Sequence, residues 1–201
     1  MKKVLVAAIL GLAAVTSVKA QGSIVLYNYA TGKQVLYGIG SGGTVGQPVS
    51  TPGFNVGFYW VNGASAAAIN SGLAGDTAAN GDLSILAPTL SVFAGANGTT
   101  TTDSGFPGYF SANSSSANLG VAGGSTVTIV LVAYNGANYA SSNIRGHSAA
   151  FQMTAQALPA TAADVGTGAW TSFQVSLVPE PSTFALAGLG LAGLLIFRRR
   201  N

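Results

Sequence analysis

The stretch STVTIVLVAYNG, residues 125–136, decides the fold. β-Branched and aliphatic residues fill it and an Asn-Gly turn signal closes it, which predicts a β-strand. In a strand, Val127, Ile129 and Leu131 share one face, and Val130 and Val132 lie on the other. Because both faces are apolar, we expect a central strand that is covered on both sides.

The segments around this stretch also predict strands. Residues 54–61 place Phe54, Val56, Phe58 and Trp60 on one face. In residues 148–156 the expected inward side chains are Ala149, Phe151 and Met153, and in residues 170–177 they are Phe173, Val175 and Leu177. Two further strands are expected over residues 23–29 and 83–95, the second interrupted by Pro88. Strands bounded by turn residues predict an all-β fold, an antiparallel β-sandwich of jelly-roll or Ig-like type.

The connections of this sandwich are predicted to be long and rich in Gly, Ser and Asn. Residues 38–53 and 94–120 have no apolar period and are expected to be loops. Residues 62–81 are rich in alanine and are expected to hold at most one short helical turn. No amphipathic helix of useful length is expected within residues 21–177.

Charge is scarce and lies mainly at the two ends of the chain. Only 6% of the 201 residues are charged, against roughly 25% in ordinary soluble domains. Between residues 21 and 178, Lys33 and Arg145 face four aspartates, which gives a net charge of −2. The overall basic balance therefore reflects the ends and excludes a nucleic-acid partner. The chain has no cysteine, which excludes disulfides and thiol chemistry.

The first twenty residues have the pattern of a secretory signal. Lys2 and Lys3 precede an apolar run, and the small residues Val18 and Ala20 stand at the positions before a cleavage site. We predict that a signal peptidase cuts after Ala20. The exported domain would then comprise residues 21–177.

Catalytic patterns are weak in this domain, and we predict that it is not an enzyme. Residues 38–43 match G-x-G-x-x-G, but no helix start follows, so a dinucleotide loop is not expected. His147 is the single histidine, and no G-x-S-x-G elbow accompanies it. The one candidate cofactor is Ca²⁺, for which Asp76, Asn80 and Asp82 offer oxygen ligands without the EF-hand spacing.

Three aromatic residues are candidates for carbohydrate contact, because a ring face can pack on the C–H face of a sugar. Trp170 lies on the polar face of its predicted strand, with Ser172 and Gln174. Tyr59 lies opposite the Phe54 face, and Tyr109 lies in a Gly-Pro loop. Single exposed aromatic residues also occur without any ligand.

The last residues, 178–201, read VPEPSTFALAGLGLAGLLIFRRRN. Pro179, Glu180 and Pro181 predict an extended stretch without a strand ladder. A single transmembrane helix is expected over about residues 183–197; its uncharged run, 184–197, is about 21 Å long as a helix. That length is short for a bilayer core of roughly 30 Å, so flanking residues must help. The basic tail, Arg198, Arg199 and Arg200, is expected to stay on the cytoplasmic side.

This order of Val178, the Pro-Glu-Pro triplet, a span and an arginine cluster resembles the PEP-CTERM sorting signal. The resemblance implies recognition by an exosortase, a membrane processing enzyme, and cleavage near the triplet. It also implies a Gram-negative bacterium that makes exopolysaccharide, and delivery to the cell surface or matrix. A permanent single-span anchor remains the alternative.

These features together predict a function at the cell surface. We expect a structural or adhesive protein, with exopolysaccharide as a candidate partner, held by its C-terminal helix in the membrane before processing. The alternative is a carbohydrate-binding or glycan-active domain.

Overall fold

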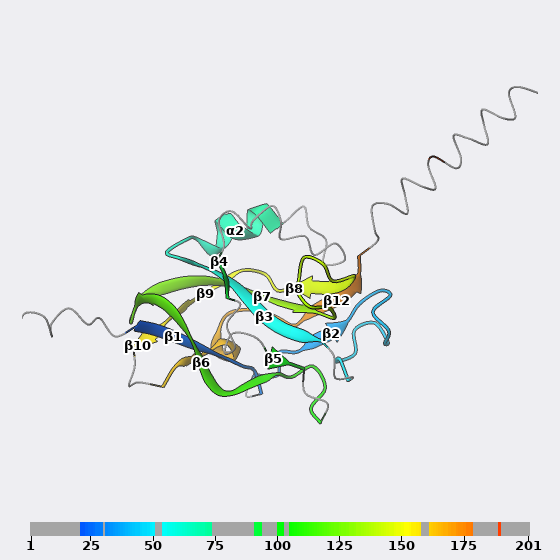
Figure 1. Ribbon diagram of the computed structural model, residues 1–201, viewed down its shortest axis with the longest axis horizontal. Helices are drawn as coiled ribbons and strands as arrows, with labels where there is room; N and C mark the ends of the chain where they lie inside the picture. Colours follow the sequence, from blue (N-terminus) through cyan, green and yellow to red (C-terminus); the bar gives the residue numbers. More distant parts are fainter. Residues whose placement is uncertain are drawn as a thin grey trace, which may run out of the picture.

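Two β-sheets make up the domain, and almost no helix accompanies them (Figure 1). The structure, a computed structural model, describes residues 21–29, 31–50, 54–73, 91–93, 100–102, 105–157, 161–178 and 189. The predicted signal with Ala20 lies outside these residues, as do Asp76, Asn80 and Asp82.

The larger sheet contains eight strands in the order β2-β12-β8-β7-β3-β4. β5 also pairs with β3, and β9 also pairs with β7. β3 pairs with β7 along the whole length of β3, from Asn55 opposite Tyr134 to Asn62 opposite Val127. The bounds are β2 Val35–Tyr37, β3 Asn55–Asn62, β4 Ser91–Phe93, β5 Thr100–Thr101, β7 Thr126–Tyr134, β8 Ile144–His147, β9 Phe151–Thr154 and β12 Phe173–Leu177.

The smaller sheet is built around β1 (Gln21–Tyr27). β6 (Ser111–Ala122) pairs with one edge of β1, and the other edge takes β10 (Gln156–Ala157) and then β11 (Ala163–Asp164). β11 runs parallel to β1, and β12 runs parallel to β2. The prediction of a purely antiparallel sandwich is therefore wrong at these two pairs, because late segments of the chain return beside its first strands. Jelly-roll or Ig-like topology remains a prediction.

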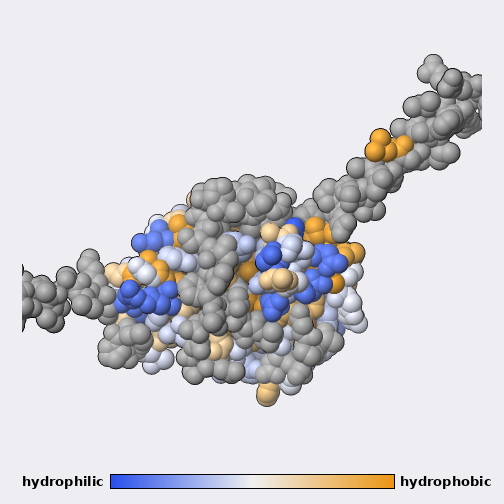
Figure 2. Space-filling view, viewed as in Figure 1, coloured by the Kyte–Doolittle hydropathy of each residue, from blue (hydrophilic) through white to orange (hydrophobic). Residues whose placement is uncertain are grey.

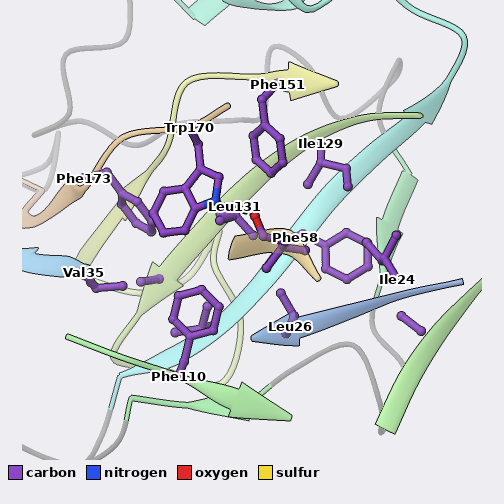
Figure 3. Packing of buried hydrophobic residues seen from close by; sticks show 14 of the residues in the cluster. Ile24, Leu26, Val35, Phe58, Phe110, Ile129, Leu131, Phe151, Trp170 and Phe173 are labelled. Carbon is purple, nitrogen blue, oxygen red and sulfur yellow. Dashed lines mark hydrogen bonds between the residues drawn. The ribbon is translucent and has the colours of Figure 1, made fainter. Parts of the chain in front are cut away.

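The main hydrophobic core lies between the two sheets (Figure 3). Ile24 and Leu26 of β1 pack in one cluster with Ile129 and Leu131 of β7 and Phe58 of β3. All five side chains are almost fully buried. The alternation predicted for β3 and β7 is confirmed, since their odd and even residues enter different clusters.

A second core covers the outer face of the larger sheet. The helix α2 (Ala66–Leu73) lies over this face (Figure 1), and its Ile69 and Leu73 pack with Val130 and Val132. The Asn70 side chain fixes the helix: its Nδ2 donates to the Ala150 carbonyl at 3.1 Å, and the Ala150 N–H donates to its Oδ1 at 2.6 Å. β7 is therefore covered on both sides, as its sequence predicts, and the helix is longer than the expected single turn.

The predicted loop over residues 94–120 is wrong in its second half. Residues from Ser111 onward belong to β6, whose twelve residues make it the longest strand that the structure describes. Its sequence is mostly Ser, Ala and Asn. Ala117 and Leu119 are buried in the main core, and the partly buried Ala112 and Val121 pack against it. β6 forms because its backbone pairs with β1 from Gln21 to Tyr27, and not because its side chains favour a strand.

Smaller corrections concern strand ends. Ala149 is exposed and Ala150 is buried, because β9 begins only at Phe151. At the end of β12, Leu177 is exposed and Ser176 is buried, the reverse of the prediction. The short strands β2 and β8 were not predicted at all.

Among the described residues, no helix has both the length and the apolar character needed to cross a membrane. The span predicted over residues 183–197 lies outside them, apart from Leu189.

Candidate functional site

Trp170, a predicted carbohydrate contact, lies in the main core. It is 2% exposed, and its ring lies 6.1–6.5 Å from the rings of Phe110, Phe151 and Phe173 (Figure 3). Its Nε1 donates to the Val165 carbonyl at 2.7 Å. The prediction that Trp170 faces solvent is wrong, because β12 begins at Phe173 and strand alternation does not extend back to residue 170.

Lys33 completes the surroundings of Trp170. Its Nζ lies 5.6 Å from the centroid of the Trp170 ring and donates to the Gly166 carbonyl at 2.9 Å and to the Gly168 carbonyl. Both carbonyls belong to the turn around the 3₁₀-helix η2 (Val165–Thr167). Burial raises the pKa of the neighbouring Asp164, while the Gly166 N–H and Lys33 oppose that shift. Lys33, one of the few charged residues of the domain, therefore stabilises the turn around η2 and packs on the Trp170 ring.

Tyr59, the second predicted contact, packs in the second core, on the outer face of the larger sheet, and is 8% exposed. Its ring meets that of Tyr139 edge-on at 6.1 Å, and Tyr139 meets Tyr134 in the same way. Burial raises the pKa of Tyr59 and of Tyr134, and for Tyr59 the charge of Tyr134 adds to the shift while Arg145 opposes it. Neither Trp170 nor Tyr59 offers a ring face to a ligand in this structure.

Tyr109, the third candidate, belongs to a group at the surface that we call the aromatic surface cluster: Tyr27, Tyr29, Phe106 and Tyr109. Tyr29 stacks on Tyr27 and on Tyr109, with ring centroids 5.3 Å apart in both pairs. Phe106 meets Tyr29 edge-on, also at 5.3 Å. Tyr27 is 37% exposed and Phe106 is 58% exposed, so the cluster presents ring surface to solvent.

Asn28 holds the two halves of this cluster together. It is fully buried between Tyr27 and Tyr29 in the sequence. Its Oδ1 accepts the Phe110 N–H at 2.7 Å, and its Nδ2 donates to the Lys33 carbonyl at 2.6 Å. The end of β1 is thereby tied to the turn that carries Phe106 and Tyr109.

Gly108 lets that turn approach closely. Its φ is +75°, and a Cβ at this position would lie 2.7 Å from the Val35 carbonyl oxygen. Sequence reasoning missed the cluster. The only signal was a polar residue between two tyrosines in the first strand.

The described residues bring together no group of three His, Cys, Asp or Glu side chains that could hold a metal. His147 is buried, and its Nδ1 lies 2.9 Å from the Ser148 carbonyl oxygen. The Ser148 hydroxyl accepts the Leu131 N–H at 3.0 Å and donates to the Ala149 carbonyl at 2.8 Å. Through these contacts with backbone groups, His147 and Ser148 stabilise the end of β8 beside β7.

The domain ends where the predicted sorting signal begins. The Leu177 N–H donates to the Ile39 carbonyl at 2.8 Å, and the Val178 N–H donates to the Asn143 carbonyl at 2.7 Å. The next predicted processing residues lie outside the described part of the chain; they are Pro179, Glu180, Pro181, Arg198, Arg199 and Arg200.

Comparison with known proteins identifies this last segment. The family model of the PEP-CTERM protein-sorting motif matches residues 177–200. No curated protein and no solved structure matches the chain. The resemblance drawn from the sequence is therefore confirmed, and the motif marks an exported protein that an exosortase sorts through the membrane to the cell surface.

Proposed function

We propose that this chain, with its PEP-CTERM sorting motif, is a non-catalytic protein of the cell surface or exopolysaccharide matrix with a structural or adhesive role. One observation carries the proposal: the motif starts at residue 177, where β12 ends. The last strand that the structure describes thus ends at the residue where the sorting motif begins. Its described charged side chains are few, and both Lys33 and Arg145 bond to backbone carbonyls. An almost uncharged domain suits a hydrated polysaccharide matrix.

The proposed route has two processing steps. A signal peptidase cuts after Ala20, and the helix over residues 183–197 then holds the chain in the membrane with Arg198–Arg200 on the cytoplasmic side. An exosortase cuts near Pro179-Glu180-Pro181 and delivers the domain outward. The host in this proposal is a Gram-negative bacterium. A Ca²⁺ site at Asp76, Asn80 and Asp82 remains a prediction.

The intact mass of the exported protein tests this route. We expect a chain that begins at Gln21 and ends near Pro181, whereas the same chain in an exosortase-deficient host should keep its arginine tail. Recovery of Arg198–Arg200 on the surface form in the normal host would contradict processing and indicate a permanent anchor.

A second candidate function, carbohydrate binding, is favoured by the aromatic surface cluster. Its exposed rings, at Tyr27 and Phe106, can pack on the C–H face of a pyranose. Asn28 and Gly108 hold the cluster in place before any ligand arrives, which reduces the entropy lost on binding.

The change Phe106→Ala, and separately Tyr109→Ala, should weaken binding of the exported protein to the host exopolysaccharide by about tenfold, because truncating an aromatic anchor typically costs ~1–2 kcal/mol. Polysaccharide pull-down with titration measures this. The matched control is Ile39→Ala, an exposed apolar residue outside the cluster, and it should leave binding unchanged. Equal binding by all variants would remove this second candidate.

A further inference from the structure

Exposed apolar side chains gather at the end of the domain where the chain leaves it. Ile39 is 75% exposed, Val45 is 54% exposed and Leu177 is 44% exposed. Ile39 and Val45 belong to the loop of residues 38–46, called here the 38–46 loop, which follows β2. Figure 1 shows this loop, in light blue, at the same end as β12, and Figure 2 shows hydrophobic surface there.

Backbone hydrogen bonds order the 38–46 loop and hold it against the end of β12. The Gly38 N–H donates to the Val175 carbonyl at 2.7 Å, and the Ile39 carbonyl accepts the Leu177 N–H at 2.8 Å. At its base, the Gly46 N–H donates to the Tyr37 carbonyl at 2.8 Å. These bonds extend the pairing of β2 with β12 beyond the strands themselves.

Glycine is required where the loop meets Leu177. Gly40 has a φ of +72°, and a Cβ there would lie 2.7 Å from the Leu177 Cβ. The side chains that the loop turns outward are therefore held in place beside the chain exit. The loop sequence, GIGSGGTVG, contains no charged residue, so no charge has to lose its hydration when Ile39 and Val45 make apolar contact with a surface.

The length of chain beyond the domain limits how far this loop can lie from a bilayer. The last described backbone bond is at Val178, and the predicted span begins at about residue 183. A fully extended residue covers at most about 3.6 Å, so five residues reach about 18 Å. While the span is inserted, Val178 must therefore lie within about 18 Å of the start of the span, and the loop that is bonded to the neighbouring Leu177 is held close to the membrane surface.

We propose that the 38–46 loop is a membrane-contact site, with Ile39 and Val45 inserted among the lipid headgroups of the outward-facing leaflet while the tail is in the membrane. The inference rests on the membrane-held stage of the proposed function. The contact would orient the domain on the bilayer and hold the Pro179-Glu180-Pro181 triplet at the depth at which a membrane enzyme works.

The test uses the full chain, which has no cysteine of its own. Ile39→Cys and Val45→Cys carry an environment-sensitive fluorophore, and each full-length protein is reconstituted into phosphatidylcholine vesicles that contain brominated lipid. Because exposed Thr126 begins β7 and the chain exit lies beside its far end, Thr126→Cys is the matched control. We expect the loop probes at about 5–10 Å into the headgroup and acyl boundary. The Thr126 probe should stay in water.

Flotation of the vesicles tests the C-terminal membrane span separately from the loop contact. If the chain floats and the loop probes stay in water, the loop contact is wrong and the membrane span is supported. If the chain does not float, both are wrong. A probe that becomes shielded without lipid, in proportion to protein concentration, would identify a second copy as the occupant and overturn the lipid contact. The change Ile39→Asp should return the Val45 probe to water without loss of flotation.

Discussion

Replacing Trp170 by alanine should lower the free energy of unfolding by about 3–5 kcal/mol, the usual cost of removing a buried Trp or Phe ring from a core. The ring packs among Phe110, Phe151 and Phe173. The change also removes the donor to the Val165 carbonyl and the aromatic face beneath Lys33. Denaturant unfolding of the exported protein measures the loss.

Two companion variants make the Trp170 result specific. Trp170→Phe keeps a ring but loses the Nε1 donor, so its stability should lie between those of the wild type and the alanine variant. Phe106→Ala removes a ring that is 58% exposed and should change stability by about 0.5 kcal/mol or less. An alanine variant at residue 170 with normal stability but lost polysaccharide binding would contradict the core position and restore a surface role.

A chain that ends at Val178 should fold with unchanged thermal stability and fail completely to reach its surface destination. β12, the last strand in the described part of the chain, ends at Leu177, and the bond from Val178 to Asn143 is retained in such a chain. Delivery should fail because the sorting motif, residues 177–200, is then almost entirely absent. Cell fractionation measures delivery, and thermal unfolding of the recovered domain measures its stability.

The matched control for this truncation ends four residues earlier, at Gln174. That chain loses Val175, which is fully buried in the main core, and the backbone partner of the 38–46 loop. It should be recovered in much lower yield and unfold at a lower temperature. If the chain ending at Val178 were destabilised to the same extent, the boundary between the fold and the sorting signal would lie further along the chain.

The sequence was sufficient to predict the centre of the larger sheet. In β3 and β7, large apolar residues alternate or fill both faces, and burial follows directly from that pattern. It was not sufficient for β6, because Ser and Asn carry little preference for a strand and the strand depends on its pairing with β1. Trp170 was misplaced because it lies in the connection before β12, where the alternation of a strand does not apply.

The aromatic surface cluster could not be predicted from local pattern, since Tyr29 and Tyr109 are far apart in the sequence. Their stacking depends on Asn28, which joins the end of β1 to Phe110 through two hydrogen bonds: its backbone N–H donates to the Phe110 carbonyl, and its Oδ1 accepts the Phe110 N–H. The sorting motif is the opposite case. Its residues are contiguous and its order is specific, so the sequence alone was enough to predict it.

The place of β12 in the larger sheet also sets the order in which the protein can mature. β12 is the last strand that the structure describes, yet it lies between β2 and β8. Among the described strands, β2 pairs with β12, and its other backbone bonds go to residues 46–49 and to Gly108. In a chain exported from its N-terminus, the pairing of β2 with β12 cannot form until residues 173–177 have crossed the membrane. Such late, long-range pairing is slow relative to local structure. On the proposed route, we therefore expect the domain to complete its folding only after translocation is nearly finished.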